Sequence, residues 1–294
     1  PAKSPPAANA DPGPVCLMPI PPNAPEPPAA HSRHGRPAGR WAYTDATGAL
    51  CFFHDRYEPK GERKQFSPVT LWRFPDGRLA WQFKAAPAPR LLLGLPDLAA
   101  KPGPAVIVEG EKARDAALLL FPENPVLTWQ GGCQAVAKAD WSPLAGRGCR
   151  LWPDADPPGE KAMGDVAAAL AAVDAGKVAV FNLANFARRA IDADGLAALA
   201  DGEPLGQGDD AADLVARGWT AAHLALLLNE PETLRPVEPP AKARTSAAVA
   251  NEGEAPKPQR FESDAKGIWL NESNGGRRWV CAPLHVAAAV RCSK

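Results

Sequence analysis

The sequence has no apolar run that approaches the 18 or so residues of a membrane-spanning helix, so we exclude that class of protein. It has no positively charged leader followed by an apolar stretch, so we expect no signal peptide and predict a cytoplasmic protein. The six cysteines are scattered, with no CxxC pair and no close spacing to histidine. Because a structural zinc site needs four ligands, usually in close pairs, we predict reduced thiols and no such site.

Three further features are absent or scarce. The P-loop pattern GxxxxGKS/T does not occur, which excludes a nucleotide-driven motor within this chain. The 33 basic and 33 acidic residues cancel, so no overall positive field indicates a nucleic-acid partner. Only two tyrosines occur, Tyr43 and Tyr57, and this limits any mechanism that needs a tyrosine nucleophile.

Proline, by contrast, is abundant, at 34 of 294 residues against an average of about 5%. Twelve prolines fall in residues 1–40 and six in residues 231–260. Both stretches are rich in alanine and charged residues and show neither helical nor strand periodicity. We therefore predict a disordered proline-rich linker over 1–40 and a proline- and alanine-rich linker over 231–260.

The balanced charge is unevenly distributed along the chain. Residues 31–100 carry 11 basic and 6 acidic residues, whereas residues 101–230 carry 11 basic and 18 acidic residues. Residues 41–103 alternate apolar and polar positions around turn residues, which predicts a small β-rich, basic subdomain. Basic residues interleaved with aromatics can bind a single nucleic-acid strand, although an ordinary sheet with a solvated basic face is equally consistent. The candidate nucleic-acid contacts are Arg40, Arg56, Arg63, Lys64, Arg73 and Lys84.

From residue 104 the pattern changes to short apolar runs that alternate with helical periodicity. This alternation predicts an α/β fold with a parallel sheet of about four strands flanked by helices. The expected strands are residues 105–108, 125–128, 150–152 and 177–181, and the expected helices are residues 112–120, 160–175, 210–217 and 220–228.

Acidic residues follow two of these expected strands directly. Glu109 comes after 105–108, with Gly110 allowing a tight turn, and Asp154 and Asp156 come after 150–152. Ligands of such sheets bind beyond the carboxyl ends of the strands, where these carboxylates would converge. Oxygen-only ligands favour Mg²⁺ or Mn²⁺. Each motif alone is also compatible with an ordinary loop, but together they favour a functional site.

Three segments in register resemble a Toprim domain, the domain shared by bacterial-type primases, type IA and type II topoisomerases and some nucleases. They are Val108-Glu-Gly-Glu-Lys112, Thr128-Trp-Gln-Gly-Gly132 and Leu151-Trp-Pro-Asp-Ala-Asp-Pro-Pro-Gly159. A fourth, Gly208-Asp-Asp-Ala-Ala-Asp-Leu214, resembles the acidic motif that closes this domain in phage and plasmid primases. The resemblance identifies residues 104–230 as the catalytic domain.

The resemblance implies roles for the carboxylates. Glu109 matches the glutamate that acts as general acid/base or metal ligand in nucleotidyl transfer, and Asp154 and Asp156 match the Asp-x-Asp that holds Mg²⁺. Asp210 is a further candidate metal ligand, but it also fits a helix N-cap. Asp213 fits an early acidic residue in the same helix better than it fits a ligand.

It also implies contacts with phosphate. Gly131 and Gly132 match the glycine turn at which the backbone approaches substrate phosphate, and Gly110 permits the turn that follows Glu109. Lys112 is a candidate phosphate contact, although a lysine on a helix surface is the simpler interpretation.

The flanking segments resemble one branch of this family, the primases of plasmids, phages and integrated elements. Residues 41–100 resemble the segment before the Toprim domain. Residues 261–294 resemble the start of a helicase-like domain, although a separate hairpin fits them nearly as well. No upstream zinc finger is present in this sequence, which leaves independent template selection in question.

The leading hypothesis is a primase-like nucleotidyltransferase of a mobile-element replication protein. It would make short RNA primers on single-stranded DNA from nucleoside triphosphates, by Mg²⁺- or Mn²⁺-dependent phosphoryl transfer and with a helicase domain as partner. The alternatives are a metal-dependent Toprim nuclease and a catalytically silent nucleic-acid-binding module. A topoisomerase is disfavoured, because Tyr43 and Tyr57 lie outside the acidic domain.

Overall fold

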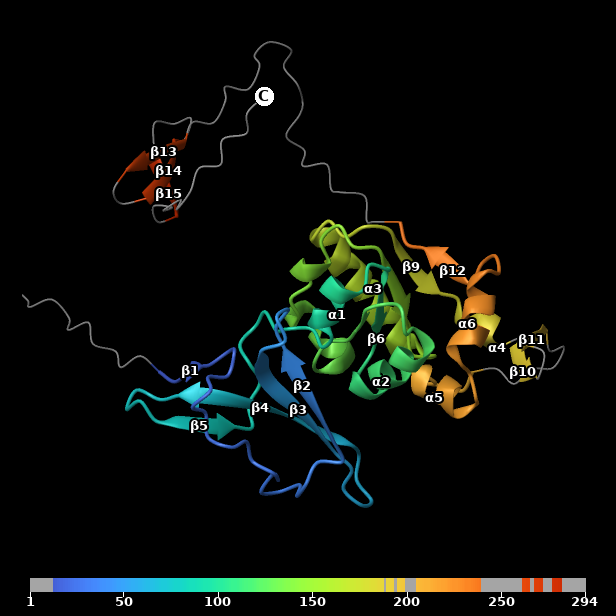
Figure 1. Ribbon diagram of the computed structural model, residues 1–294, viewed down its shortest axis with the longest axis horizontal. Coiled ribbons are helices and arrows are strands. Elements are labelled where there is room, and N and C mark those ends of the chain that lie inside the picture. The colour runs from blue at the N-terminus through green and yellow to red at the C-terminus, as the bar shows by residue number, and fades with distance from the viewer. Residues whose placement is uncertain are drawn as a thin grey trace, which may run out of the picture. The chain divides into compact units, whose positions relative to one another are not determined.

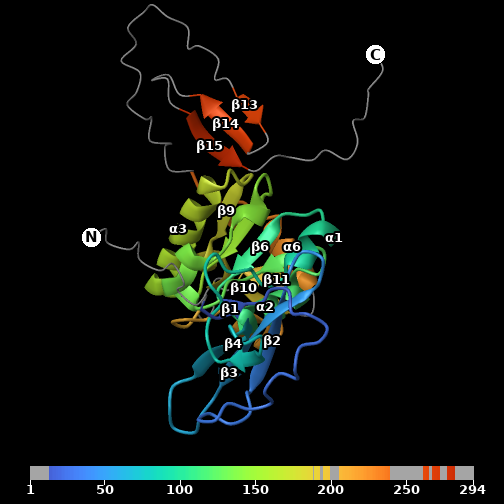
Figure 2. The same ribbon diagram turned by 90° about the vertical axis from the view of Figure 1, so that its left-hand side faces the viewer.

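A computed structural model describes most of the chain, namely residues 13–187, 189–192, 195–198, 205–238, 261–264, 267–271 and 277–281. The chain divides into two compact units, Pro1–Lys242 and Ala243–Lys294 (Figures 1 and 2). In the part of the chain described, no helix has both the length and the apolar character needed to cross a membrane. Residues 1–12 and 239–260, which belong to the two expected linkers, lie outside the described residues.

The first unit begins with an antiparallel sheet of five strands, drawn in blue and cyan in Figure 1. The order is β1-β4-β3-β2, and β5 pairs with β4. The strands are β1 (Val15–Cys16), β2 (Gly39–Thr44), β3 (Leu50–Tyr57), β4 (Gln65–Arg73) and β5 (Leu79–Gln82). The strands expected within residues 41–103 are thus present as two hairpins, β2–β3 and β4–β5.

Residues 13–38 differ from the linker expected over residues 1–40, because they are packed along this sheet. The amide of Leu17 donates to the carbonyl of Leu71 at 2.9 Å, and the amide of Ile20 donates to the carbonyl of Leu50 at 2.7 Å. The indole Nε1 of Trp81 donates to the carbonyl of Pro25 at 2.7 Å. Proline restricts the chain to extended conformations without preventing such contacts, since its carbonyl still accepts hydrogen bonds.

The second part of this unit is an α/β layer structure, as its alternating sequence pattern predicts. Its sheet has the order β12-β9-β8-β6-β7, and the pairs β7–β6, β6–β8 and β8–β9 are parallel. The edge strand β12 pairs antiparallel with β9, so residues 234–236 belong to this sheet and not to the linker expected over residues 231–260. The strands are β6 (Ala105–Val108), β7 (Val126–Leu127), β8 (Cys149–Trp152), β9 (Val178–Phe181) and β12 (Leu234–Pro236).

Helices cover both faces of this sheet, and strand β6 shows why. Ala105 and Ile107 point into a core with helix α3, whereas Val106 and Val108 point into a core with α2, α5 and α6. All four side chains are buried, as expected of a central parallel strand. The α-helices are α1 (Leu95–Ala100), α2 (Glu111–Leu120), α3 (Pro157–Ala172), α4 (Leu183–Ala187), α5 (Ala211–Ala216) and α6 (Ala221–Leu228), and the 3-10 helices are η1 (Gly132–Lys138) and η2 (Ser142–Leu144).

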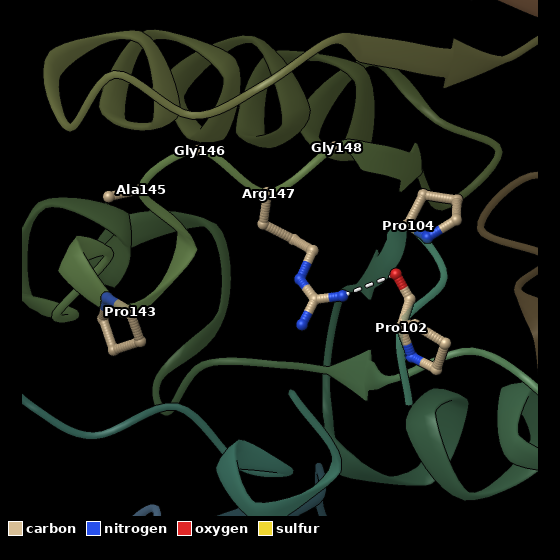
Figure 3. A pocket seen from close by; sticks show the side chains of 7 residues that line it. All are labelled: Pro102, Pro104, Pro143, Ala145, Gly146, Arg147 and Gly148. Atoms are coloured by element: carbon tan, nitrogen blue, oxygen red, sulfur yellow. Dashed lines mark hydrogen bonds between the residues drawn. The ribbon is translucent and has the colours of Figure 1, made fainter. Parts of the chain in front are cut away.

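At the opposite edge from the carboxyl ends of the parallel strands, Arg147 holds a loop closed. Its guanidinium donates to the carbonyls of Leu98, Lys101, Pro102 and Gly103, and Figure 3 shows one of these bonds beside the prolines that line the adjoining pocket. These bonds satisfy carbonyls in the last turn of helix α1 and in the segment that follows it, so this pocket is accounted for by loop closure.

The structure also contains two small antiparallel sheets. Strands β10 (Arg189–Asp192) and β11 (Gly195–Ala198) form a hairpin in the first unit. Strands β13 (Phe261–Asp264), β14 (Gly267–Asn271) and β15 (Arg277–Cys281) form a three-stranded sheet in the second unit. The assignment of residues 261–294 to a helicase-like domain stays a prediction.

Candidate active site

The carboxylates singled out by the sequence gather at the carboxyl ends of the central parallel strands. Glu109 follows β6 directly, and Asp154 follows the neighbouring strand β8 after one proline. Asp210 begins helix α5 and lines the same cleft, which has a volume of about 550 Å³. Two backbone bonds explain this meeting, because Ala155 donates to the carbonyl of Asp209 at 2.9 Å and Gly208 donates to the carbonyl of Ala155 at 3.2 Å.

Glu109 is positioned by the glycine turn that follows β7. Its Oε1 accepts a hydrogen bond from the amide of Cys133 at 2.9 Å. A Cβ atom on Gly132, whose φ is +62°, would lie 3.3 Å from that same oxygen. Gly131 has a φ of +96°, and a Cβ there would lie 2.9 Å from the Cβ of Ala135. Both positions therefore require glycine if Glu109 is to keep this backbone contact.

The other half of this turn is held by side chains of β7 and its extension. The hydroxyl of Thr128 accepts from the amide of Gly110 at 2.9 Å, and the indole of Trp129 donates to the carbonyl of Gly132 at 2.8 Å. The backbone on both sides of Glu109 is thus tied to the neighbouring strand. A side chain that is fixed in this way is suited to catalytic work, which needs precise placement.

The electrostatic environment of these acids is unfavourable for negative charge. Burial raises the pKa of Glu109, and the charge of Asp156 raises it further. Burial, followed by the charges of Glu109, Asp210 and Asp156, raises the pKa of Asp154 to about 8. The pKa of Asp210 is also raised, chiefly by burial. Carboxylates that destabilise one another in this way form a site that a cation would stabilise.

Asp156 and Asp210 also perform structural work as helix caps. Asp156 is the N-cap of α3 and accepts from the amide of Gly159 at 2.7 Å. Asp210 accepts from the amide of Ala212 at 2.6 Å, and Asp213 returns a bond by accepting from the amide of Asp210 at 2.9 Å. Asp210 therefore combines the cap and the cleft positions that the sequence left open, whereas Asp156 affects the cleft through its charge.

Two lysines line the same cleft as this acidic cluster. Lys112, in the first turn of α2, is exposed, lines the cleft and partly offsets the rise in the pKa of Asp210. Lys64, from the loop before β4, lines it too and partly offsets the rise in the pKa of both Glu109 and Asp154. The cleft thus places lysines beside carboxylates, an arrangement suited to phosphate and a metal ion together.

Of the six basic residues selected in the N-terminal segment, only Arg56 and Lys64 line this cleft. Arg40 lies on the other face of the sheet, where its guanidinium binds Asp55 through two hydrogen bonds of 2.6 and 2.7 Å. Lys84 packs over the ring of Trp72 at 4.2 Å. Arg63 and Arg73 are exposed and lie outside the cleft lining.

A buried network that sequence reasoning missed joins the N-terminal sheet to the α/β layer. Oε1 of Glu111, in α2, accepts from the hydroxyl of Tyr43 at 2.8 Å and bonds Nδ1 of His54. Burial alone would raise the pKa of Glu111, but the bonds from His54 and Tyr43 and the charge of His54 hold it below its ordinary value. The indole of Trp41 adds a bond to Asp115 at 2.7 Å. These contacts make one face of the sheet a wall of the cleft.

The donor set fits a magnesium ion, because every candidate ligand is a carboxylate oxygen. Among the described residues, no three aspartate, glutamate, histidine or cysteine side chains come close enough to hold a metal by themselves. Mg²⁺ is commonly held by one or two carboxylates together with substrate phosphates and water, which this cleft allows.

No protein-family model matches the chain, and no curated protein matches it. Among solved structures it is similar to a DNA primase domain from Pseudomonas aeruginosa, at 14% identity and a TM-score of 0.43, over 70% of this chain and 56% of that one. It is similar to the zinc-binding and RNA polymerase domains of the Aquifex aeolicus primase, at 18% identity and 0.40, over 64% and 38%. A third similar structure is the E. coli primase catalytic core, at 17% identity and 0.40, over 67% and 52%. The chain thus spans about half or less of the length of the primase structures to which it is similar.

Proposed function

We propose that this chain is the catalytic part of a primase-like nucleotidyltransferase that makes short RNA primers on single-stranded DNA. The observation that carries the proposal is one cleft in which Glu109, Asp154 and Asp210 face Lys64 and Lys112. Phosphoryl transfer requires carboxylates for a metal ion and cations for phosphate, in one place and shielded from bulk water. The motifs that resemble a Toprim domain supply these same carboxylates, and the flanking segments suggest a mobile-element replication protein with a helicase partner.

In this mechanism the chain's residues divide the work. Asp154 and Asp210, together with substrate phosphates and water, would hold Mg²⁺, which would polarise the phosphoryl group and neutralise developing charge. Lys112 binds the phosphates of the incoming nucleotide, and Lys64, from the loop before β4, binds phosphate next to the N-terminal sheet. The raised pKa of Glu109 suits its Oε2 to accept a proton from the attacking hydroxyl, while Oε1 stays bonded to the backbone.

The test is template-dependent synthesis of labelled RNA on single-stranded DNA with Mg²⁺. Glu109→Gln keeps the shape and the bond from Cys133 but removes the charge, so we expect primer synthesis to fall at least about a hundredfold. Glu123→Gln, an exposed residue outside the cleft, is the matched control and should leave synthesis unchanged. Degraded template in place of RNA would show a nuclease, and tight DNA binding without either product would show a silent binding module. Synthesis that survives Glu109→Gln would refute the site.

A second prediction concerns the template path. Lys64→Glu should weaken binding of single-stranded DNA and reduce the slope of log affinity against log salt by about 0.7, the value of one lost phosphate contact. Arg73→Glu makes the same charge change at an exposed position outside the cleft, and should have a smaller effect. Fluorescence anisotropy over a range of salt concentrations measures both. Equal losses in the two variants would show a diffuse charge effect and remove Lys64 from the path.

A further inference from the structure

The wall of the cleft that faces the carboxylates comes from the N-terminal sheet. Strand pairing puts its residues on one face, since Trp41 lies opposite His54 and Arg56 lies opposite Phe66. The wall residues are Trp41, His54, Arg56, Lys64 and Phe66. The wall therefore combines aromatic rings with cations, the combination that single nucleotides and single strands require.

Phe66 is the exposed ring of this wall. The residue is 43% exposed, although it lines a cleft and belongs to strand β4. One face of the ring is backed by the imidazole of His54, with ring centroids 5.5 Å apart and an angle of 21° between the planes. His54 is itself fixed by its bond to the buried Glu111. The ring of Phe66 is therefore held in place by His54, and its exposed surface can contact a flat ligand.

Cationic groups stand next to this ring. Arg56 lies directly opposite Phe66 in the strand pair. Its Nη2 pairs with the more exposed Glu58 at 2.5 Å, and its Nε is buried without a hydrogen-bond partner in the described part of the chain. A buried N–H donor without an acceptor costs free energy, and an anionic ligand oxygen would remove that cost. Lys64, two residues before Phe66, acts electrostatically on Glu109 and Asp154. The ring of Phe66, the guanidinium of Arg56 and the candidate catalytic carboxylates therefore line one cleft.

We propose that Phe66 is a stacking platform for a nucleobase, and that Arg56 and Lys64 bind the phosphate of the same nucleotide. The proposal rests on the proposed nucleotidyl transfer and adds to it the contact that holds the base. Because every nucleobase has a π-face, this contact is tolerant of sequence. The base can come from the template strand or from the incoming nucleoside triphosphate, and the experiment separates the two.

The experiment is equilibrium binding in Mg²⁺, measured by calorimetry for wild type, Phe66→Ala and Phe66→Trp. The ligands are ATP with its base-free counterpart, inorganic tripolyphosphate, and a DNA oligonucleotide with an abasic oligonucleotide of equal length. We expect Phe66→Ala to weaken binding of ATP or of the normal oligonucleotide about tenfold, in line with the loss of one base–aromatic stack. The base-free ligands should bind as before, and Phe66→Trp should retain the affinity.

The outcomes are separable. A loss with ATP assigns the platform to the incoming nucleotide, and a loss with the oligonucleotide assigns it to the template. Phe83 is a matched control, because it is 36% exposed on the same subdomain, packs on His31 and lies outside the cleft. Unchanged binding of both base-bearing ligands in Phe66→Ala, or an equal loss with base-free ligands, would overturn the platform while leaving the proposed function intact. Wild-type protein that binds neither ATP nor DNA would refute both.

Discussion

Asp154→Asn is expected to abolish primer synthesis and, in EDTA, to make the protein more stable to heat. The substitution removes a half-buried carboxylate that lies among other carboxylates, of which Glu109 and Asp210 act on it most strongly. It therefore relieves repulsion in the metal-free protein while removing a candidate metal ligand. We expect synthesis to fall about a hundredfold or more, and the midpoint of thermal unfolding to rise by about 2–8 °C.

The pH dependence of this stabilisation has a definite sign. Burial and the neighbouring carboxylates raise the pKa of Asp154 to about 8 in the folded protein, from an ordinary value of 3.8. Between these values the folded state binds more protons than the unfolded state, so wild-type stability falls as pH rises. The advantage of Asp154→Asn should therefore grow from about pH 4 to pH 8 in EDTA. Thermal unfolding followed by circular dichroism at several pH values measures it.

A surface aspartate provides the control for this experiment. Asp165 is exposed and pairs with Lys161 on the outside of α3 at 2.7 Å. Asp165→Asn should change the unfolding free energy by less than about 0.5 kcal/mol and leave synthesis intact. Adding Mg²⁺ should raise the unfolding midpoint of wild type more than that of Asp154→Asn. An Asp154→Asn protein that is no more stable than wild type at pH 8 in EDTA would contradict the electrostatic account.

The positions of the carboxylates could be predicted because they depend on short-range rules. Glu109 and Asp154 each stand within two residues of a buried apolar run, and parallel strands bring their carboxyl ends to one edge of the sheet. The position of Asp210 is harder to predict from the sequence, because it depends on backbone hydrogen bonds between the loops around Ala155 and Gly208. Neither loop contains a sequence pattern that predicts these bonds.

The basic segment was harder to interpret, because strand register decides what each arginine contacts. Arg40 and Arg56 look alike in sequence, yet Arg40 lies opposite Asp55 and binds it, whereas Arg56 lies opposite Phe66 in the cleft wall. A hydrophobic pattern alone does not fix which residues of two strands face each other. The packing of residues 13–38 was missed for a related reason, since an extended proline-rich chain shows no periodicity whether it is free or bound to a sheet.

The contact between the N-terminal sheet and helix α2 could not be predicted from the sequence. Glu111 follows the candidate catalytic Glu109 by two residues, and an acidic residue in the first turn of a helix needs no buried partner, because the helix dipole alone favours it there. Its partners Tyr43 and His54 come from strands more than 50 residues earlier. Only the three-dimensional structure shows that Glu111 binds Tyr43 and His54 of the N-terminal sheet, and that His54 in turn contacts Phe66.

Glu111→Ala should therefore be the most destabilising single substitution that we predict. The side chains of Glu111 and His54 are each 4% exposed, and Tyr43 is fully buried. Removing the carboxylate leaves the imidazole and the hydroxyl buried without their shared acceptor. Breaking a buried pair in this way costs about 3–5 kcal/mol, or about 6–20 °C in the unfolding midpoint of a unit of this size. Urea and thermal denaturation both measure the loss.

Two comparisons test whether the expected destabilisation comes from the buried bonds between Glu111, His54 and Tyr43. Asp115→Ala removes the more exposed bond to Trp41 across the same contact, and should cost no more than about 1 kcal/mol. Glu111→Leu combined with His54→Leu should cost less than the sum of the two single changes, because neither buried partner is then left alone. The lowered pKa of Glu111 adds a third criterion. Its stabilisation is present above the unfolded value and is lost as pH falls through the folded one, so wild type and Glu111→Ala should converge in acid. Additive single changes, or a constant difference down to low pH, would show that Glu111 does not couple the sheet to the helix.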